Sequence, residues 1–302
     1  MAYRGETYPF EELLALRGSE NFAAKIRPAW QRRQYERCQM QIDRMASILD
    51  EAGPDVVLII GDDQFEWFSE FVQPSFAVFC GKQVENLAMT DEEIRAHRAD
   101  GRLIDPLGYH PPSNAIYPVA QSLAEHIISQ AILEGFDVSA CMRQPKADHG
   151  LINLGHAYGF VYRQLLRDRP IPLVPVLVNT FYPPNQPTPQ RCIHFGRAMG
   201  RAIKSWPTKA SVAVCASGGL SHFVIDEQFD ETILTALKNA DYTALMSQPD
   251  AMFRSGTSEI KNWLIAAGVL AETDLAMTVL DYVPCYRTEA GTGNAMAFAV
   301  WR

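Results

Sequence analysis

Three runs of almost continuous apolar residues constrain the fold of this chain most strongly. They span residues 55–60 (DVVLII), 172–180 (PLVPVLVNT) and 211–216 (SVAVCA). A strand covered on one side alternates apolar and polar residues, whereas a strand covered on both sides loses this alternation. We therefore expect the three runs to be neighbouring strands of one central sheet, with helices packed on both faces.

The segments between these runs carry helical patterns and shorter strand-like runs. From 30 to 51, apolar residues recur at steps of three and four, which predicts a helix that Pro28 opens and Gly53 ends. Further helices are expected at 120–131, 188–206, 226–239 and 257–267, and further strands at 76–80, 136–141 and 295–301. No repeat or shift in composition marks a boundary. The sequence thus predicts an α/β fold in which residues 1–302 form a single domain around a mixed or mainly parallel sheet.

Composition and charge exclude several classes of protein. The net charge of −8, with no basic cluster, argues against a nucleic-acid partner. No apolar run reaches the ~18 residues that a membrane-spanning helix needs, and the amino terminus lacks the pattern of a signal peptide. Six scattered cysteines without a CxxC pair favour buried thiols over disulfides or a zinc site. We therefore expect a cytoplasmic protein with no membrane partner.

Two glycine-containing turns carry the histidines of greatest chemical interest. The loop Ser217-Gly218-Gly219-Leu220-Ser221-His222 follows the apolar run 211–216, and Asp148-His149-Gly150 follows the run 136–141. Open α/β sheets bind ligands at the carboxyl ends of their strands, and histidine is suited to proton transfer near neutral pH. A histidine beside a turn can equally cap a helix or fill a polar pocket. His156, in the helix after Gly150, could face the same cavity, but core packing is the simpler interpretation.

The order of these motifs resembles that of the class III extradiol ring-cleavage dioxygenases, in particular the catalytic subunit of the protocatechuate 4,5-dioxygenase type. Each motif is common by itself, but their shared order along the chain is specific. The matching segments are DVVLIIGDD with PSFAVFC, Asp148-His149-Gly150, PLVPVLVNTFYPP, Arg191-Cys192, the loop 217–222, and Ser255-Gly256 with Glu259 and Trp263-Leu264-Ile265.

The resemblance implies a non-haem Fe(II) cofactor, held by two histidines and one carboxylate, with open positions for the oxygens of a catecholate and for dioxygen. It assigns the carboxylate ligand to Glu259, which by position alone would be an acidic residue at a helix start. It assigns acid–base roles to His222 and His149. The residues expected to contact the substrate beside them are Asp148, Gly219 and Ser221.

The ligand set that the resemblance implies is incomplete in this sequence. The family's first ligand histidine lies in an N-terminal strand and loop, whereas the first histidine of this chain is His97. The second ligand histidine follows the strand that matches residues 55–60, and Gln64 stands at that place. An amide oxygen is a neutral and weaker ligand for Fe(II) than imidazole. With Gln64 and Glu259 as the assigned metal positions, we expect weak binding of Fe(II).

Three explanations are open. In the first, the chain lacks the family's N-terminal strand and the histidine on it. In the second, the oxygen donors of Asp62, Asp63 or Glu66 form a different metal set with Gln64 and Glu259, although this stretch also fits an ordinary polar turn. In the third, the chain is a metal-free partner or binding subunit of a dioxygenase complex.

The function expected from the resemblance is that of an extradiol ring-cleavage dioxygenase-like protein, impaired in this form. Its substrates would be a catechol-like or aminophenol-like aromatic acid and dioxygen. A homo-oligomer or a small second subunit is the protein partner to consider.

Overall fold

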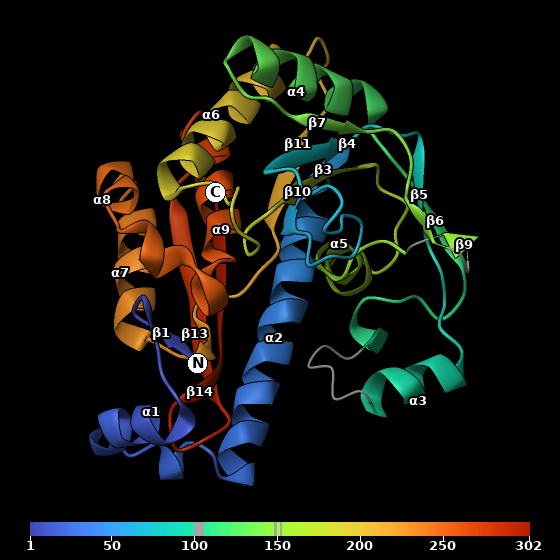
Figure 1. The fold of residues 1–302 in the computed structure, drawn as a ribbon. Helices are drawn as coiled ribbons and strands as arrows, with labels where there is room; N and C mark the ends of the chain where they lie inside the picture. Colours follow the sequence, from blue (N-terminus) through green and yellow to red (C-terminus); the bar gives the residue numbers. More distant parts are fainter. Residues whose placement is uncertain (100–105, 148–149, 152) are drawn as a thin grey trace.

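A five-stranded sheet forms the centre of the structure (Figure 1). The computed structural model describes residues 1–99, 106–147, 150–151 and 153–302. The strands of the sheet are, in spatial order, β11 (Val212–Ala216), β3 (Val56–Asp62), β10 (Leu173–Val178), β4 (Phe76–Phe79) and β7 (Ser139–Cys141). Only the β10–β4 pair in this sheet is antiparallel. The prediction that the three apolar runs are neighbouring strands is therefore confirmed.

Helices cover both faces of this sheet, which confirms the expected α/β architecture. In β3, Val56, Leu58 and Ile60 belong to one core cluster, whereas Val57 and Ile59 belong to another. All seven residues of β3 are buried, which explains its almost continuous apolar run. The first cluster includes residues of α4 (Gln121–Leu133), α6 (Pro189–Ser205), α7 (Glu227–Lys238) and α9 (Ile260–Leu270); the second includes residues of α2 (Pro28–Ala52), α5 (His156–Phe160) and the π-helical turn η4 (Val161–Leu165).

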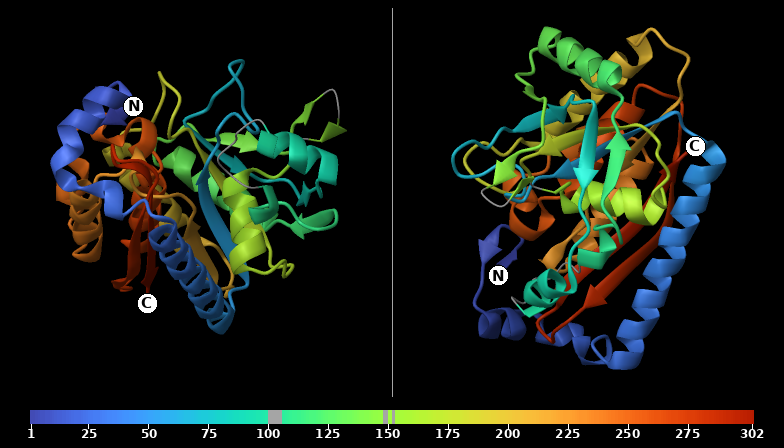
Figure 2. Two further views of the ribbon diagram at one scale, coloured as in Figure 1. Left: turned by 90° about the horizontal axis from the view of Figure 1, so that it is seen from below. Right: turned by 90° about the vertical axis from the view of Figure 1, so that its right-hand side faces the viewer.

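A second, antiparallel sheet lies beside α2 (Figures 1 and 2). It consists of β12 (His222–Val224), β14 (Thr292–Trp301) and β13 (Met277–Tyr286), in that spatial order. The sequence patterns predicted part of β14 but not β13, because Asp281 and Pro284 interrupt the strand pattern there. The strand predicted at 136–141 is also shorter than expected, since β7 covers only its last three residues.

The remaining elements surround these two sheets. They are α1 (Phe10–Arg17), α3 (Asp91–Ala99), α8 (Tyr242–Met246), the 3-10 turns η1 (Gly18–Glu20), η2 (Phe22–Ala24), η3 (Pro106–Gly108), η5 (Asp250–Phe253) and η6 (Ser255–Thr257), and the strand pairs β1 (Ala2–Tyr3) with β2 (Glu6–Thr7), β5 (Gln83–Asn86) with β6 (Ala115–Pro118), and β8 (Lys146–Ala147) with β9 (Gly150–Leu151). Among the described helices, none is long and apolar enough to cross a lipid bilayer.

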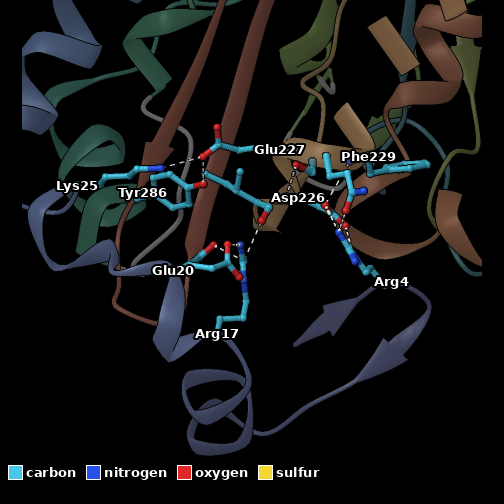
Figure 3. Close-up of polar contacts among 12 residues, drawn as sticks. Arg4, Arg17, Glu20, Lys25, Asp226, Glu227, Phe229 and Tyr286 are labelled. Carbon is cyan, nitrogen blue, oxygen red and sulfur yellow. Dashed lines mark hydrogen bonds and ion pairs between the residues drawn. The ribbon is translucent and has the colours of Figure 1, made fainter. Parts of the chain in front are cut away.

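Charged side chains attach the N-terminal segment to the rest of the molecule (Figure 3). Arg4 donates hydrogen bonds of 2.6 and 2.9 Å to the carboxylate of Asp226, the residue before α7. Arg17 is buried. Its guanidinium pairs with Glu20 and also donates hydrogen bonds to the backbone carbonyls of Ile225 and Gly291. Because a buried arginine needs such partners, these contacts fix the segment against α7 and the β13–β14 hairpin.

Candidate active site

Three segments meet at the carboxyl edge of the central sheet. β3 leads into the turn Asp62-Asp63-Gln64, β11 leads into the loop 217–221, and α9 begins directly after Glu259. Because β3 and β11 are parallel neighbours, their carboxyl ends deliver both turns to the same edge. This edge is where open α/β sheets form ligand sites.

Glu259 is at the centre of the site. Its Oε1 accepts a hydrogen bond from Nε2 of Gln64 at 3.3 Å and lies 3.3 Å from Nε2 of His222. Its Oε2 accepts the backbone N–H of Gly219 at 2.8 Å. The structure thus brings together Gln64, Gly219, His222 and Glu259.

The glycine loop packs closely against the start of α9. Gly218 has a φ of +151°, and a Cβ at this position would lie 3.0 Å from Cβ of Glu259. Asn262 donates to the carbonyl of Ser217 at 2.8 Å, and Trp263 donates to the carbonyl of Gly218 at 3.0 Å. Glycine permits both the backbone conformation and the close approach. The loop sequence therefore determines how near Glu259 can come to His222.

A second carboxylate lies beside Glu259. Asp62 is 1% exposed; its Oδ2 accepts from Nε2 of Gln64 at 2.8 Å, and its Oδ1 accepts from Asn262 at 3.4 Å. Burial and the nearby charge of Glu259 raise the pKa of Asp62 to about 6. Gln64 donates to both carboxylates, which reduces their mutual repulsion. A carboxyl group that titrates near neutral pH is suited to accept or release a proton.

His222 and Glu259 form a buried ion pair. Nδ1 of His222 lies 3.0 Å from the carbonyl of Leu220, so Nε2 faces Glu259. Burial by itself lowers the pKa of His222, but the hydrogen bond to Glu259 and its charge raise it above the ordinary value. Burial raises the pKa of Glu259, but His222 and the N–H of Gly219 lower it below the ordinary value. The pair with Glu259 therefore favours the protonated form of His222, whose side chain lines the cavity.

His156 and Glu66 form another ion pair at the site. Nδ1 of His156 lies 2.9 Å from Oε2 of Glu66, and the backbone N–H of His156 donates to Oε1 at 2.8 Å. Burial lowers the pKa of His156, but the bond to Glu66 and the charges of Asp62 and Glu259 raise it to about 10. The expectation of core packing missed this residue. The sequence feature that could have identified His156 as a site residue is its position at the start of a helix, which follows the polar turn that carries Glu66 along the chain.

The site opens into a cavity of about 1060 Å³. Its polar lining includes Asp62, His156, Gly219, His222 and Glu259. Most of the remaining lining comes from α2, β11 and β14. Since sites for drug-sized ligands typically measure ~300–1,000 Å³, a single-ring aromatic acid would fill only part of this cavity.

Ser221 has a supporting position and does not line the cavity. It is fully buried; its Oγ donates to Oδ2 of Asp230 at 2.6 Å, and its N–H donates to Oδ1 at 2.9 Å. Tyr282 also donates to Oδ2 of Asp230, at 2.7 Å. This position is at odds with the expected contact between Ser221 and the substrate. Its bonds to Asp230 instead hold the loop that carries His222.

The other predicted residues divide into two groups. Asp148 and His149 lie outside the described residues. Asp63 is described and is buried, and its carboxylate accepts the backbone N–H groups of Trp67 and Phe68. Asp63 therefore closes the polar turn, whereas its neighbour Asp62 faces the cavity.

The described residues do not fit an iron centre of two histidines and one carboxylate. Both oxygens of Glu259 are engaged by N–H donors, and Gln64 directs its amide nitrogen, which is not a metal ligand, at the two carboxylates. Within the described ranges, no group of three or more His, Cys, Asp or Glu side chains is arranged to hold a metal ion. Asp62, Gln64, His222 and Glu259 instead form a hydrogen-bonded network of two carboxylates, an amide and an imidazole.

The sequence is similar to known proteins along most of its length. A family described as the catalytic LigB subunit of aromatic ring-opening dioxygenase matches residues 31–293. A gallate dioxygenase of Pseudomonas putida is 31% identical over 169 residues, which cover 50% of this chain and 45% of that protein. The match thus spans less than half the length of this relative.

Proposed function

Because the chain belongs to the family of catalytic LigB subunits of aromatic ring-opening dioxygenases, we propose that it is an aromatic ring-cleavage dioxygenase-like protein that binds a catechol-like or aminophenol-like aromatic acid. The observation that carries this proposal is the buried His222–Glu259 pair beside Asp62 in the cavity wall. These groups suit a substrate that carries two neighbouring, weakly acidic donors.

The proposed roles follow from the charges of the three side chains. A phenolic hydroxyl of the substrate donates to Asp62, whose pKa of about 6 lets the carboxylate accept a proton near neutral pH. The second oxygen or amine shares the Nε2–H of His222 with Glu259, and Glu259 stabilises the protonated imidazole. His149, Asp148 and Gly219 are proposed to complete the substrate contacts.

A metal-free binding subunit is the second candidate function. The bonding of Glu259 favours it, because N–H groups already engage both carboxylate oxygens. In that case the site would retain the aromatic acid without ring opening, and a separate catalytic subunit would be required.

Three measurements on anaerobically purified protein test these proposals. The first is the affinity for protocatechuate, gallate and 2-aminophenol, the second is the iron content after reconstitution with Fe(II), and the third is oxygen uptake. Because loss of even one hydrogen-bonding partner of a metal ligand lowers metal affinity by ~10–100-fold, we expect binding of an aromatic acid with iron far below one equivalent and slow oxygen uptake. His222→Gln should weaken aromatic-acid binding by about tenfold, since a hydrogen bond to a charged group is lost.

The control is Glu231→Gln, which changes an exposed carboxylate on α7. One equivalent of iron with rapid oxygen uptake would support a competent dioxygenase. Binding of an aromatic acid without iron or oxygen uptake would support the metal-free subunit. If none of the three compounds binds, both proposals are wrong.

A further inference from the structure

Much of the cavity lies beside the polar site and has a different character. Between α2, β11 and β14 its walls are mainly apolar; lining residues include Ile42, Met45, Val214, Trp263, Phe298 and Trp301. We call this part the β11 groove. At ~30 Å³ per water molecule, the whole cavity of 1060 Å³ corresponds to about 35 waters. Holding water against apolar walls is unfavourable, so the groove is suited to an apolar occupant.

One wall of the β11 groove is an unpaired sheet edge. β11 is the last strand in the order of the central sheet, and within the described residues no strand pairs with its outer side. Its five residues are all half-buried, whereas every residue of β3 and β10 is buried. An unpaired edge presents backbone N–H and C=O groups with which a further strand can bond.

The hydrogen bonds of β11 show which of these groups face the groove. The carbonyl of Ser211 accepts the N–H of Val56 at 3.1 Å, and the N–H of Ser217 donates to Ile60 at 2.8 Å. Residues 211 and 217 therefore face β3. Because the two sides of a strand alternate, the N–H and C=O groups of Val212, Val214 and Ala216 point away from β3.

We propose that the β11 groove binds an extended polypeptide segment with apolar side chains, which adds to β11 as a sixth strand of the central sheet. At ~3.3 Å per residue, the five residues of β11 offer about 17 Å of edge, the length of a usual strand. The proposal does not depend on the function proposed for the polar site.

The two sides of β11 indicate what the added side chains would contact. Val212, Val214 and Ala216 pack with the first core cluster, which contains Trp263 and Ala266, whereas Ala213 and Cys215 pack with the second, beside Ile42 and Met45. An added strand would continue both layers, so both rows of its side chains would meet apolar surface.

The free backbone groups favour a peptide over an acyl chain or another apolar small molecule. Such a molecule would cover the apolar walls but leave the outward N–H and C=O groups of residues 212, 214 and 216 without partners. Burying unpaired backbone groups is costly. A peptide strand supplies both the apolar contacts and the hydrogen bonds.

A matched pair of synthetic peptides tests the proposal on the full chain. The probe is an acetylated and amidated peptide with six alternating valine and threonine residues between charged end residues. The control has the same sequence and charge but carries N-methyl groups on alternate amides, which removes the donors toward β11. Calorimetry should show binding of the probe and at least about tenfold weaker binding of the control, because each lost hydrogen bond contributes several-fold.

Variants of the strand edge give an independent readout. Val214→Pro removes one outward N–H and is compatible with an edge strand, whereas Val214→Ala keeps that N–H. The proline variant should bind the probe several-fold more weakly than the alanine variant, and the probe should slow hydrogen exchange at residues 212–216 of the wild type. Equal affinity for the two peptides would overturn the proposal even if the proline variant fails to fold. Binding of decanoate in the groove without binding of the probe would also overturn it.

Discussion

Replacement of Asp230 by alanine should lower the free energy of unfolding by an amount that depends strongly on pH. The carboxyl group of Asp230 is fully buried and accepts hydrogen bonds from the N–H and Oγ of Ser221 and from the hydroxyl of Tyr282. Ser221 Oγ keeps a second partner, the N–H of Asp226, at 2.9 Å. In that bond Ser221 Oγ is the acceptor, so alanine leaves three buried donors, the N–H and O–H of Ser221 and the hydroxyl of Tyr282, without their acceptor.

Two effects of opposite sign determine the magnitude. Each unpaired buried donor costs ~1–3 kcal/mol, so the three together destabilise the variant by about 6 kcal/mol. Burial raises the pKa of Asp230 from 3.8 to about 6, so the folded protein binds more protons than the unfolded chain between these values. The wild type consequently loses stability as the pH rises from 4 to 6, by about 3 kcal/mol at ~1.4 kcal/mol per pKa unit. The alanine variant has no such loss, so its net cost should be about 6 kcal/mol at pH 4 and about 3 kcal/mol at pH 7.

Urea unfolding of the wild type and Asp230→Ala at both pH values measures this difference. Glu231→Ala is the control, because the neighbouring carboxylate is exposed and its loss should change the free energy of unfolding by less than about 0.5 kcal/mol. A larger cost of Asp230→Ala at pH 7 than at pH 4 would refute the reasoning, since it would mean that the folded state favours the ionised carboxylate.

Three further outcomes are expected. Gly196→Ala should cost about 3 kcal/mol in urea unfolding, because its Cβ would lie 2.1 Å from a backbone oxygen of α9, whereas the Gly18→Ala control has open space and should be nearly neutral. Arg17→Met should cost about 2 kcal/mol by the same assay, because the buried carbonyl of Ile225 loses its donor, whereas that of Gly291 keeps the N–H of Ile225; a cost below about 1 kcal/mol would contradict this. Glu66→Gln should lower the pKa of His156 from about 10 toward 6.5, which NMR titration of the imidazole can measure; an unchanged pKa would show that Glu66 is not the main cause.

The central sheet could be predicted from the sequence because its signal is local. The side chains of β3, β10 and β11 pack against apolar clusters on both faces of the sheet, so the runs that became these strands are almost continuously apolar. The prediction of α6 also rested on local signals, because Thr188 caps the first turn and Pro189 opens the helix. By contrast, β13 depends on pairing with β14, and its own residues do not show a strand pattern.

The motifs identified the loops of the site, but contacts between distant segments decided their chemistry. Sequence spacing could not show that Gln64 and Glu259, 195 residues apart, share a hydrogen bond, or that the amide would face two carboxylates. Nor could it show that Ser221 bonds to Asp230 and supports the loop, whereas its neighbour His222 faces the cavity. Which side chain faces a cavity depends on how strands and helices from different parts of the chain pack together. Local sequence therefore determined the elements of this protein, and tertiary packing determined the partners, charges and exposure of its functional groups.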